Sequence, residues 1–336
     1  MEWNYINNCL TAKEYIDYEV IADAIRNRKP KVKVSLNTDI KNVMTLVYDS
    51  FPELFYVSRK YQIITGMGKR WVEINYIYSE SQTANYAKKI ESVTSQFIRK
   101  YVENTFTDYD KEKVVYDYLK NNLTYDFQDA TGSGLLQNEN AHNLVGALID
   151  KRCVCDGFAA AMKYLCNLLG IECICVSGTA RNKIMSGSHA WNIVCIHGVN
   201  QHVDVTWDNK NLLNSDIDNY VYFNVDDQYM SRDHSWNRSF YPLCRSAPYN
   251  YFKVNDAIIS SEKHMLKFIR ENLDNEETDI LFRIDDECKE AEQLFSHKEQ
   301  IIQKAISMAK YAKVKAFQYS YYEEHKIISI KPEYLI

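Results

Sequence analysis

The sequence has few of the residues that interrupt regular structure, with 10 glycines and 5 prolines among 336 residues. We find no internal repeat and no low-complexity linker, so domain boundaries are weakly marked. No apolar run approaches the roughly 20 residues that a membrane-spanning helix needs. These absences predict a folded globular chain, long enough for one large core or two to three modest domains.

The sequence also lacks an excess of positive charge. Lys and Arg total 40 against 45 Asp and Glu, which gives a formal net charge of -5. Nucleic-acid-binding domains are usually strongly basic, and anionic membrane surfaces attract basic proteins. We therefore expect neither nucleic acid nor a membrane as a partner, and the composition leaves the oligomeric state open.

Nine cysteines are present, an odd number, and six of them fall between Cys153 and Cys195. An exported disulfide framework would have an even number spread more widely, so reduced thiols fit better. The first twelve residues lack the apolar core of a signal peptide. Together these features predict a cytoplasmic protein, unless the chain has been shortened at its start.

Hydrophobic periodicity predicts three domains, at residues 1–106, 107–248 and 249–336. The first contains helices at 11–28, 39–50 and 81–103 and strands at 54–57 and 70–78. The last contains helices at 261–272 and 286–310, a strand at 279–284 and a terminal hairpin of 313–321 with 327–331. Both are expected to be small α/β modules that flank a central domain, which a helix at 109–121 leads into.

Three short segments of the central domain contain the side chains of nucleophilic catalysis: 155–159 (CDGFA), 189–192 (HAWN) and 204–208 (DVTWD). They supply a thiol, an imidazole and a carboxylate in that order. The pattern from Phe158 to Leu169, followed by Gly170, predicts a helix that begins beside Cys155. The free N–H groups and the dipole of a helix N-terminus favour thiolate over thiol.

Residues 188–196 and 201–207 both alternate as strands, and His197 with Gly198 can form the tight turn between them. That register places Trp191 opposite Asp204. His189 and Asp204 then become diagonal neighbours on one face, about 7 Å apart at the backbone and within side-chain reach. A carboxylate at that position can orient the imidazole and stabilise imidazolium. We expect His202 on the opposite face from Asp204.

The three segments, in this order, resemble the transglutaminase-like family, which has a Cys-x-Gly-(Tyr/Phe)-Ala, a His-Ala-Trp and an Asp-x-Thr-Trp-Asp. The likeness extends over roughly residues 110–240, with further matches at 116–119, 124–126, 222–224 and 233–236. It implies an α+β fold with a papain/transglutaminase-like core, in which the Cys155 helix packs on an antiparallel sheet. It also selects Cys155 over Cys153 and implies that Cys155 meets His189.

The resemblance implies thiol-dependent acyl transfer on a carboxamide or peptide bond of a protein or peptide substrate. Cys155 would form a thioester, His189 would move the proton and Asp204 would orient His189. Trp191 and Trp207 are the expected substrate-binding residues, although tryptophans are more often core. No cofactor and no metal is expected. Cross-linking, deamidation and proteolysis all stay open, because the acceptor can be an amine or water.

Two other interpretations stay open at this point. Cys153, Cys155, Cys173 and Cys175 form two Cys-x-Cys pairs, but structural zinc sites more often use Cys-x₂₋₄-Cys, and 171–177 is typical of a buried strand. A catalytically silent transglutaminase-fold scaffold is the second alternative. The complete Cys, His and Asp set argues against it.

Overall fold

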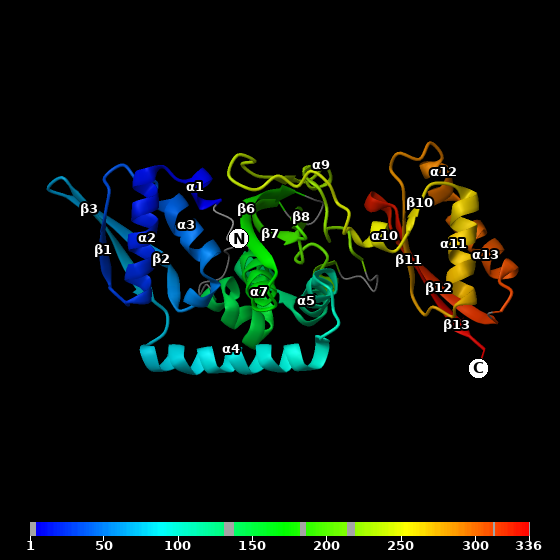
Figure 1. Cartoon of the computed structure of the whole chain (residues 1–336), viewed down its shortest axis with the longest axis horizontal. Helices are drawn as coiled ribbons and strands as arrows, with labels where there is room; N and C mark the ends of the chain where they lie inside the picture. The colour runs from blue at the N-terminus through cyan, green and yellow to red at the C-terminus, as the bar shows by residue number, and fades with distance from the viewer. Residues whose placement is uncertain (1–4, 131–137, 182–185, 214–218, 312, 336) are drawn as a thin grey trace. The chain divides into compact units, whose positions relative to one another are not determined.

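The computed structural model describes residues 5–130, 138–181, 186–213, 219–311 and 313–335 (Figure 1). The chain divides into two compact units. The first consists of Met1–Leu213 and Asn224–Ala247, and the second of Asn214–Phe223 and Pro248–Ile336. None of the described helices is long and apolar enough to cross a membrane.

The N-terminal part of the first unit combines four helical segments with a three-stranded antiparallel sheet. The helices are α1 (Ile6–Cys9), α2 (Ala12–Arg26), α3 (Ile40–Ser50) and the 3₁₀ turn η1 (Pro52–Leu54). The strands β1 (Lys31–Val34), β2 (Val57–Gly66) and β3 (Lys69–Tyr76) have the order β1-β3-β2. The capping box of Thr11 and Glu14 opens α2, which lies within the helix predicted at 11–28.

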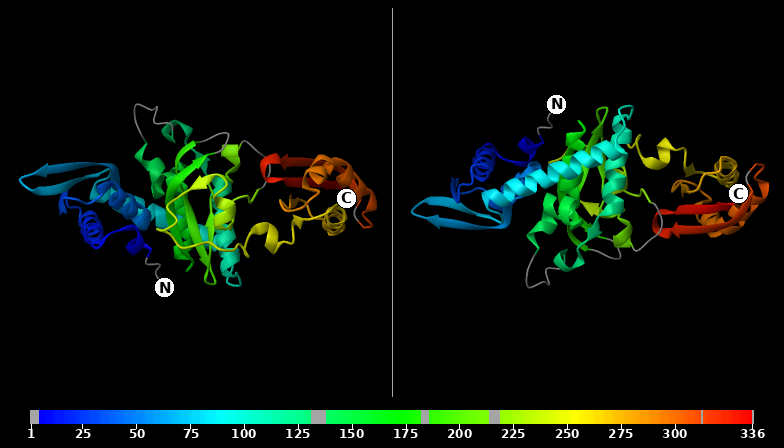
Figure 2. Two further views of the ribbon diagram at one scale, coloured as in Figure 1. Left: turned by 90° about the horizontal axis from the view of Figure 1, so that it is seen from above. Right: turned by 90° about the horizontal axis from the view of Figure 1, so that it is seen from below.

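Strands β2 and β3 form an arm that projects away from α2 and α3 in both views of Figure 2. Met67 and Gly68 turn the chain at its tip, both with positive φ (52° and 68°). The strand expected at 54–57 is wrong, because Pro52 opens a 3₁₀ turn and β2 begins at Val57. Most of β2 was not expected from the sequence, since its polar residues give no clear alternation.

Two long capped helices follow the arm. They are α4 (Glu80–Tyr101) and α5 (Asp108–Asn122), and their capping boxes are Ser79 with Gln82 and Thr107 with Asp110. Phe97 of α4 packs on Tyr118 of α5, with ring centroids 4.7 Å apart. Both helices lie close to the lengths expected from their periodicity.

The core of the first unit places one helix against a four-stranded antiparallel sheet. The helix α7 (Cys155–Leu168) contacts β6 (Glu172–Arg181) and β7 (Ser186–Ile196). The sheet order β8-β7-β6-β9 is completed by β8 (Val199–Val203) and β9 (His234–Ser235). This arrangement confirms the expected α+β core of a helix packed on an antiparallel sheet.

Short elements surround that core. They are β4 (Thr124–Tyr125), α6 (Phe127–Ala130), η2 (Glu139–His142), η3 (Val145–Asp150), β5 (Arg152–Cys153), α8 (Lys210–Leu213) and α9 (Asp227–Met230). Strands β4 and β5 pair in parallel, with Tyr125 opposite Cys153. This pairing fixes the chain two residues before Cys155.

The second unit is a four-stranded sheet with helices. Its strands β10 (Ile258–Ile259), β11 (Ile280–Ile284), β12 (Val314–Tyr322) and β13 (Ile327–Tyr334) have the order β10-β11-β13-β12. Its helices are α10 (Tyr251–Val254), α11 (Glu262–Asp274), α12 (Ala291–Ser296), α13 (Lys298–Met308) and the 3₁₀ turn η4 (Glu323–His325).

The terminal hairpin is confirmed as β12 and β13. The single helix expected at 286–310 is instead two helices. They meet at His297, which has ψ 12° and whose ring lies 2.9 Å from the carbonyl oxygen of Gln293.

Candidate functional site

Cys155 is the first residue of α7. Phe158, Met162 and Leu165 form the buried face of this helix. The chain leaves the helix at Gly170, where φ is +79°. The backbone at the start of α7 is pressed against its neighbours, since a Cβ at Gly157 would lie 2.5 Å from the carbonyl oxygen of Ala141. The helix N-terminus is thus held in place at the residue that carries the thiol.

The Cys155 side chain is half-buried and packs against Ala159 of its own helix, Cys175 of β6 and Ala190 of β7. Ala190 adjoins His189 in sequence, so the thiol lies where α7 meets β7, the strand that contains His189. The Cys155 thiol is near enough to His189 to raise the pKa of the imidazole. The structure therefore brings together the cysteine and the histidine that the sequence predicts.

The β7–β8 hairpin has the predicted register. Asn192 pairs with Val203 and Ile196 with Val199. The turn residues His197 and Gly198 both have positive φ (49° and 81°). Strand β8 ends at Val203, earlier than expected, so Asp204 lies just beyond the ladder.

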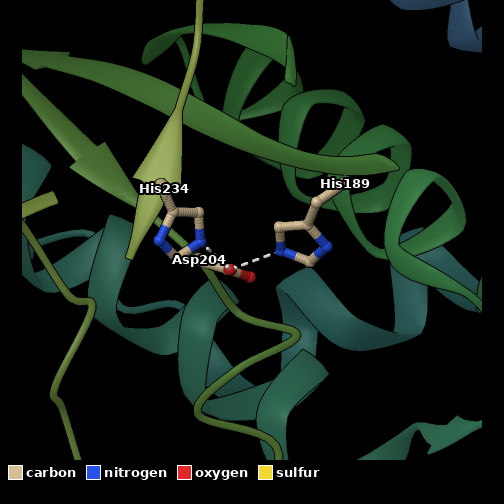
Figure 3. Close-up of side chains that lie close together, drawn as sticks. All are labelled: His189, Asp204 and His234. Atoms are coloured by element: carbon tan, nitrogen blue, oxygen red, sulfur yellow. Dashed lines mark hydrogen bonds and ion pairs between the residues drawn. The ribbon is translucent and has the colours of Figure 1, made fainter. Parts of the chain in front are cut away.

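Asp204 is buried and its two carboxylate oxygens have different partners. Oδ1 accepts the backbone N–H groups of Thr206 (2.9 Å) and Trp207 (3.2 Å). Oδ2 lies 2.7 Å from Nε2 of His189 (Figure 3). The turn after β8 therefore fixes the carboxylate that orients His189, as the sequence predicts.

Electrostatics favour a charged His189–Asp204 pair. Burial alone would lower the pKa of His189, but the charge of Asp204, the hydrogen bond to it and the neighbouring Cys155 thiol raise that pKa to about 9. Burial would raise the pKa of Asp204, but His189 and a second histidine hold it well below its usual range. An imidazolium beside Cys155 is therefore stable at neutral pH.

That second histidine is His234, which lies in the family-like segment 233–236. Its Nε2 lies 3.1 Å from Oδ2 of Asp204 (Figure 3). Its Nδ1 lies 2.5 Å from Oδ1 of Asp233. Strand β9, which pairs His234 with Ala180 of β6, holds it there. Two residues are too few to show strand periodicity, and the family-like sequence around Asp233 and His234 was the available signal.

A separate hydrogen-bonded group holds Asp156, the residue after Cys155. His142 Nδ1 lies 2.9 Å from its Oδ2, and an Arg59 guanidinium nitrogen lies 3.2 Å from the same oxygen. The other ring nitrogen of His142 lies 2.6 Å from Asp129. Burial would raise the pKa of Asp156, but Arg59 and His142 lower it. This group fixes the first turn of α7 on its outer side.

Comparison with known proteins agrees with these features. Residues 95–211 match the model of the transglutaminase-like superfamily. This stretch is a transglutaminase-like domain. The match covers the segments that contain Cys155, His189 and Asp204, and the resemblance seen in the sequence is confirmed.

Part of the chain also aligns with kyphoscoliosis peptidase. The human protein is 24% identical over 139 residues, which is 39% of this chain and 20% of that protein. The mouse protein is 22% identical over 126 residues, 35% of this chain and 18% of that protein. The chain thus spans about a fifth of the length of these curated relatives.

Two solved structures are distantly similar. One is described as a TGase, at 15% identity and a TM-score of 0.31, and the match covers 52% of this chain and 49% of the TGase chain. The other is an arylamine N-acetyltransferase of Bacillus cereus, at 18% identity and a TM-score of 0.26, covering 34% and 49%. TM-scores this low do not support comparison residue by residue.

Trp191 and Trp207 of the transglutaminase-like domain are buried, with 1% and 2% of their surface exposed. Their rings lie 6.0 Å and 5.4 Å from the ring of His189. Both therefore enclose the histidine from the interior side. Their expected role as substrate-binding residues stays a prediction.

The placement of His202 on the face opposite Asp204 is wrong. Residues two apart on a strand share a face, and His202 pairs across the sheet with Ile193, two residues after Trp191. Trp191 Nε1 donates to His202 Nδ1 (3.0 Å), and His202 Nε2 lies 2.9 Å from Asp227. An indole nitrogen can only donate, so His202 is neutral with its proton on Nε2.

Among the described residues, two groups have candidate metal ligand atoms close together: His189, Asp204 and His234, and His202, Asp227 and Cys244. Neither includes the four cysteines of the zinc alternative. Nε2 of His202 carries the proton in this tautomer, so that nitrogen has no free lone pair with which to bind a metal. Hydrogen bonds account for the short distances in the first group.

Proposed function

We propose that the transglutaminase-like domain catalyses thiol-dependent acyl transfer through a Cys155 thioester, on a carboxamide or peptide bond of a protein or peptide. The observation that supports this most strongly is a single histidine, His189, that bonds a buried carboxylate, Asp204, and whose pKa is raised by the neighbouring Cys155 thiol. A thiol, an imidazole and an orienting carboxylate are the parts that nucleophilic cysteine catalysis needs.

In this mechanism the proton of the Cys155 thiol passes to Nδ1 of His189, which leaves a thiolate and an imidazolium. The sulfur attacks the carbonyl carbon, and the imidazolium gives its proton to the departing nitrogen as that C–N bond breaks. The thioester then reacts with an amine or with water, which regenerates the thiol. The backbone N–H of Cys155, at the N-terminus of α7, can donate to the oxyanion.

The acceptor separates three activities: cross-linking if it is an amine, deamidation if water attacks after ammonia leaves, and proteolysis if water attacks after a peptide amine leaves. The nine free thiols fit action in a reducing compartment, and we place the protein in the cytoplasm.

Casein tests these three outcomes together. Incorporation of a fluorescent primary amine reports cross-linking, ammonia release reports deamidation, and new peptide termini by mass spectrometry report proteolysis. We expect one activity in the wild type and in Cys195→Ser, a half-buried thiol on β7, and none in Cys155→Ser. Equal activity in the Cys155→Ser protein would contradict the proposal, and a stable fold without any thiol reactivity would support the silent scaffold.

A further inference from the structure

The carboxylate of Asp204 is shared between two imidazoles. Its Oδ2 lies 2.7 Å from Nε2 of His189 and 3.1 Å from Nε2 of His234 (Figure 3). Both histidine side chains are buried, with 3% and 0% of their surface exposed. The Cys155 thiol raises the pKa of His189, whereas His234 turns its other nitrogen toward Asp233. The proposed mechanism uses His189 and Asp204 and assigns nothing to His234.

The contacts of His234 indicate that it is a cation. Both of its ring nitrogens face carboxylate oxygens, at 3.1 Å from Asp204 and 2.5 Å from Asp233. An ionised carboxylate only accepts hydrogen bonds, so each nitrogen has to carry a proton. Burial would lower the pKa of His234, but the hydrogen bonds to Asp204 and Asp233 and their charges raise it. Geometry and electrostatics thus agree.

The other groups around His234 are aromatic or titratable. The rings of Trp207 and Trp191 lie 4.3 Å and 5.0 Å away, and the ring of His189 lies 5.4 Å away. His202 also faces it, but the indole of Trp191 keeps His202 neutral. Among the described residues, the charges that are shown to act on His234 are the carboxylates of Asp204 and Asp233, one at each ring nitrogen. The imidazolium of His189 adds a further charge when it forms.

We propose that His234, held as a cation by Asp233, is a positioning residue. Its charge weakens the stabilisation that Asp204 gives to the imidazolium of His189. This inference rests on the proposed function. A buried carboxylate paired with His189 alone would stabilise the imidazolium strongly and slow the release of its proton to the leaving nitrogen. The charge of His234 partly neutralises Asp204 and repels the imidazolium. The protons of His234 stay in place throughout the reaction.

The test is the rate at which iodoacetamide alkylates Cys155 as a function of pH, which needs no known substrate. In the wild type we expect this rate to rise in two steps as the pH increases. The upper step, at the higher pH, marks the loss of a proton by His189. His234→Gln keeps an N–H donor for Asp204 but removes the charge. The upper step should then move up by about one pH unit, because a neighbouring cation has gone. Asp233→Asn should move it in the same direction by less.

The control is His264→Gln on α11 in the second unit, which should leave both steps in place. A purely structural role would be preserved by Gln, so an unchanged upper step in folded His234→Gln and Asp233→Asn overturns the inference. If His234→Gln does not fold, Asp233→Asn decides alone, since Asp233 is partly exposed. A wild-type Cys155 that reacts no faster than Cys195 at any pH would instead overturn the proposed function, and this inference with it.

Discussion

The two oxygens of Asp204 accept four hydrogen bonds, from two backbone N–H groups and two imidazoles. An asparagine has one acceptor oxygen and one NH₂ group, so it cannot reproduce this pattern. Either two backbone donors or two imidazoles would then face an NH₂ group. The role of Asp204 is thus set by its charge and by its capacity to accept on both sides.

Asp204→Asn is therefore expected to reduce acyl transfer by about 10³-fold, because His189 loses the partner that fixes its tautomer and stabilises its charge. Cys155 alkylation at neutral pH should also slow, but less than in His189→Ala, because the helix N-terminus and the imidazole remain. The unfolding midpoint of the variant shows whether the fold survives. Asp256→Asn is a matched control, since Asp256 is exposed and Asn tolerates its positive φ of 50°. A rate within twofold of the wild type in Asp204→Asn would contradict the assigned role.

Glu112 of α5 is fully buried, and its Oε2 accepts a hydrogen bond from Asn224 at 2.8 Å. Burial raises its pKa to about 8. In the unfolded chain this carboxyl loses its proton near pH 4 to 5, whereas in the folded protein it keeps the proton up to about pH 8. Unfolding at a pH between these two values therefore releases one proton. The stability contributed by protonated Glu112 is complete below that window and is lost as pH rises through it.

Glu112→Gln removes this proton linkage while keeping the size of the side chain. The free energy of unfolding of the wild type, relative to the variant, should fall by about 1.4 kcal/mol per pH unit between roughly pH 5 and 8. Urea unfolding at several pH values measures the difference. Parallel curves for the two proteins would show that Glu112 is ionised in the folded state.

At the scale of elements, the close approach of α7 to its surroundings depends on Gly157. A Cβ there would lie 2.5 Å from the Ala141 carbonyl oxygen and 2.6 Å from Cys153 Cβ, both of which are fixed. Gly157→Ala should lower stability by about 1–3 kcal/mol and slow the alkylation of Cys155, because α7 must shift. Gly66→Ala is the control, since nothing lies within 4 Å of its Cβ position. Equal effects of the two changes on unfolding would refute this account.

The β7–β8 hairpin could be predicted from sequence because two alternating strands and a Gly-containing turn allow one register. The paired residues agree with that register, which is why His189 and Asp204 could be predicted to lie side by side. The end of β8 could not be predicted, because residues 204–207 continue the alternation while their backbone turns to donate to Asp204. His234 was missed because β9 has only two residues.

Hydrophobic periodicity does not predict contacts between segments that are distant in the sequence. The parallel pairing of Tyr125 with Cys153 involves two strands of two residues each. The group around Asp156 joins Arg59 of β2 to His142 of η2 and to α7. Such contacts depend on how elements pack, and the meeting of Cys155 with His189 came from the family resemblance alone.

At the scale of the whole molecule, the chain consists of two compact units, each with buried apolar residues of its own. We expect heat to unfold them in two transitions. Phe282→Ala removes a fully buried ring from β11 of the second unit and should cost about 3–5 kcal/mol there. Calorimetry should show one transition lowered and the other unchanged, with Cys155 alkylation at 25 °C as in the wild type. One transition that moves as a whole would show that the units unfold together.

The most direct test of the central claim is the pH dependence of Cys155 alkylation by iodoacetamide, mapped by mass spectrometry in the wild type and in His189→Ala. Cys195 is the internal comparison, since it is half-buried like Cys155, whereas Cys153 is fully buried and would react slowly for that reason alone. Because His189 keeps its proton up to about pH 9, we expect wild-type Cys155 to outpace Cys195 by at least about tenfold near neutral pH. His189→Ala should lose that advantage at neutral pH and regain speed in alkali. Equal rates for Cys155 and Cys195 across this range, in both proteins, would contradict an activated nucleophile.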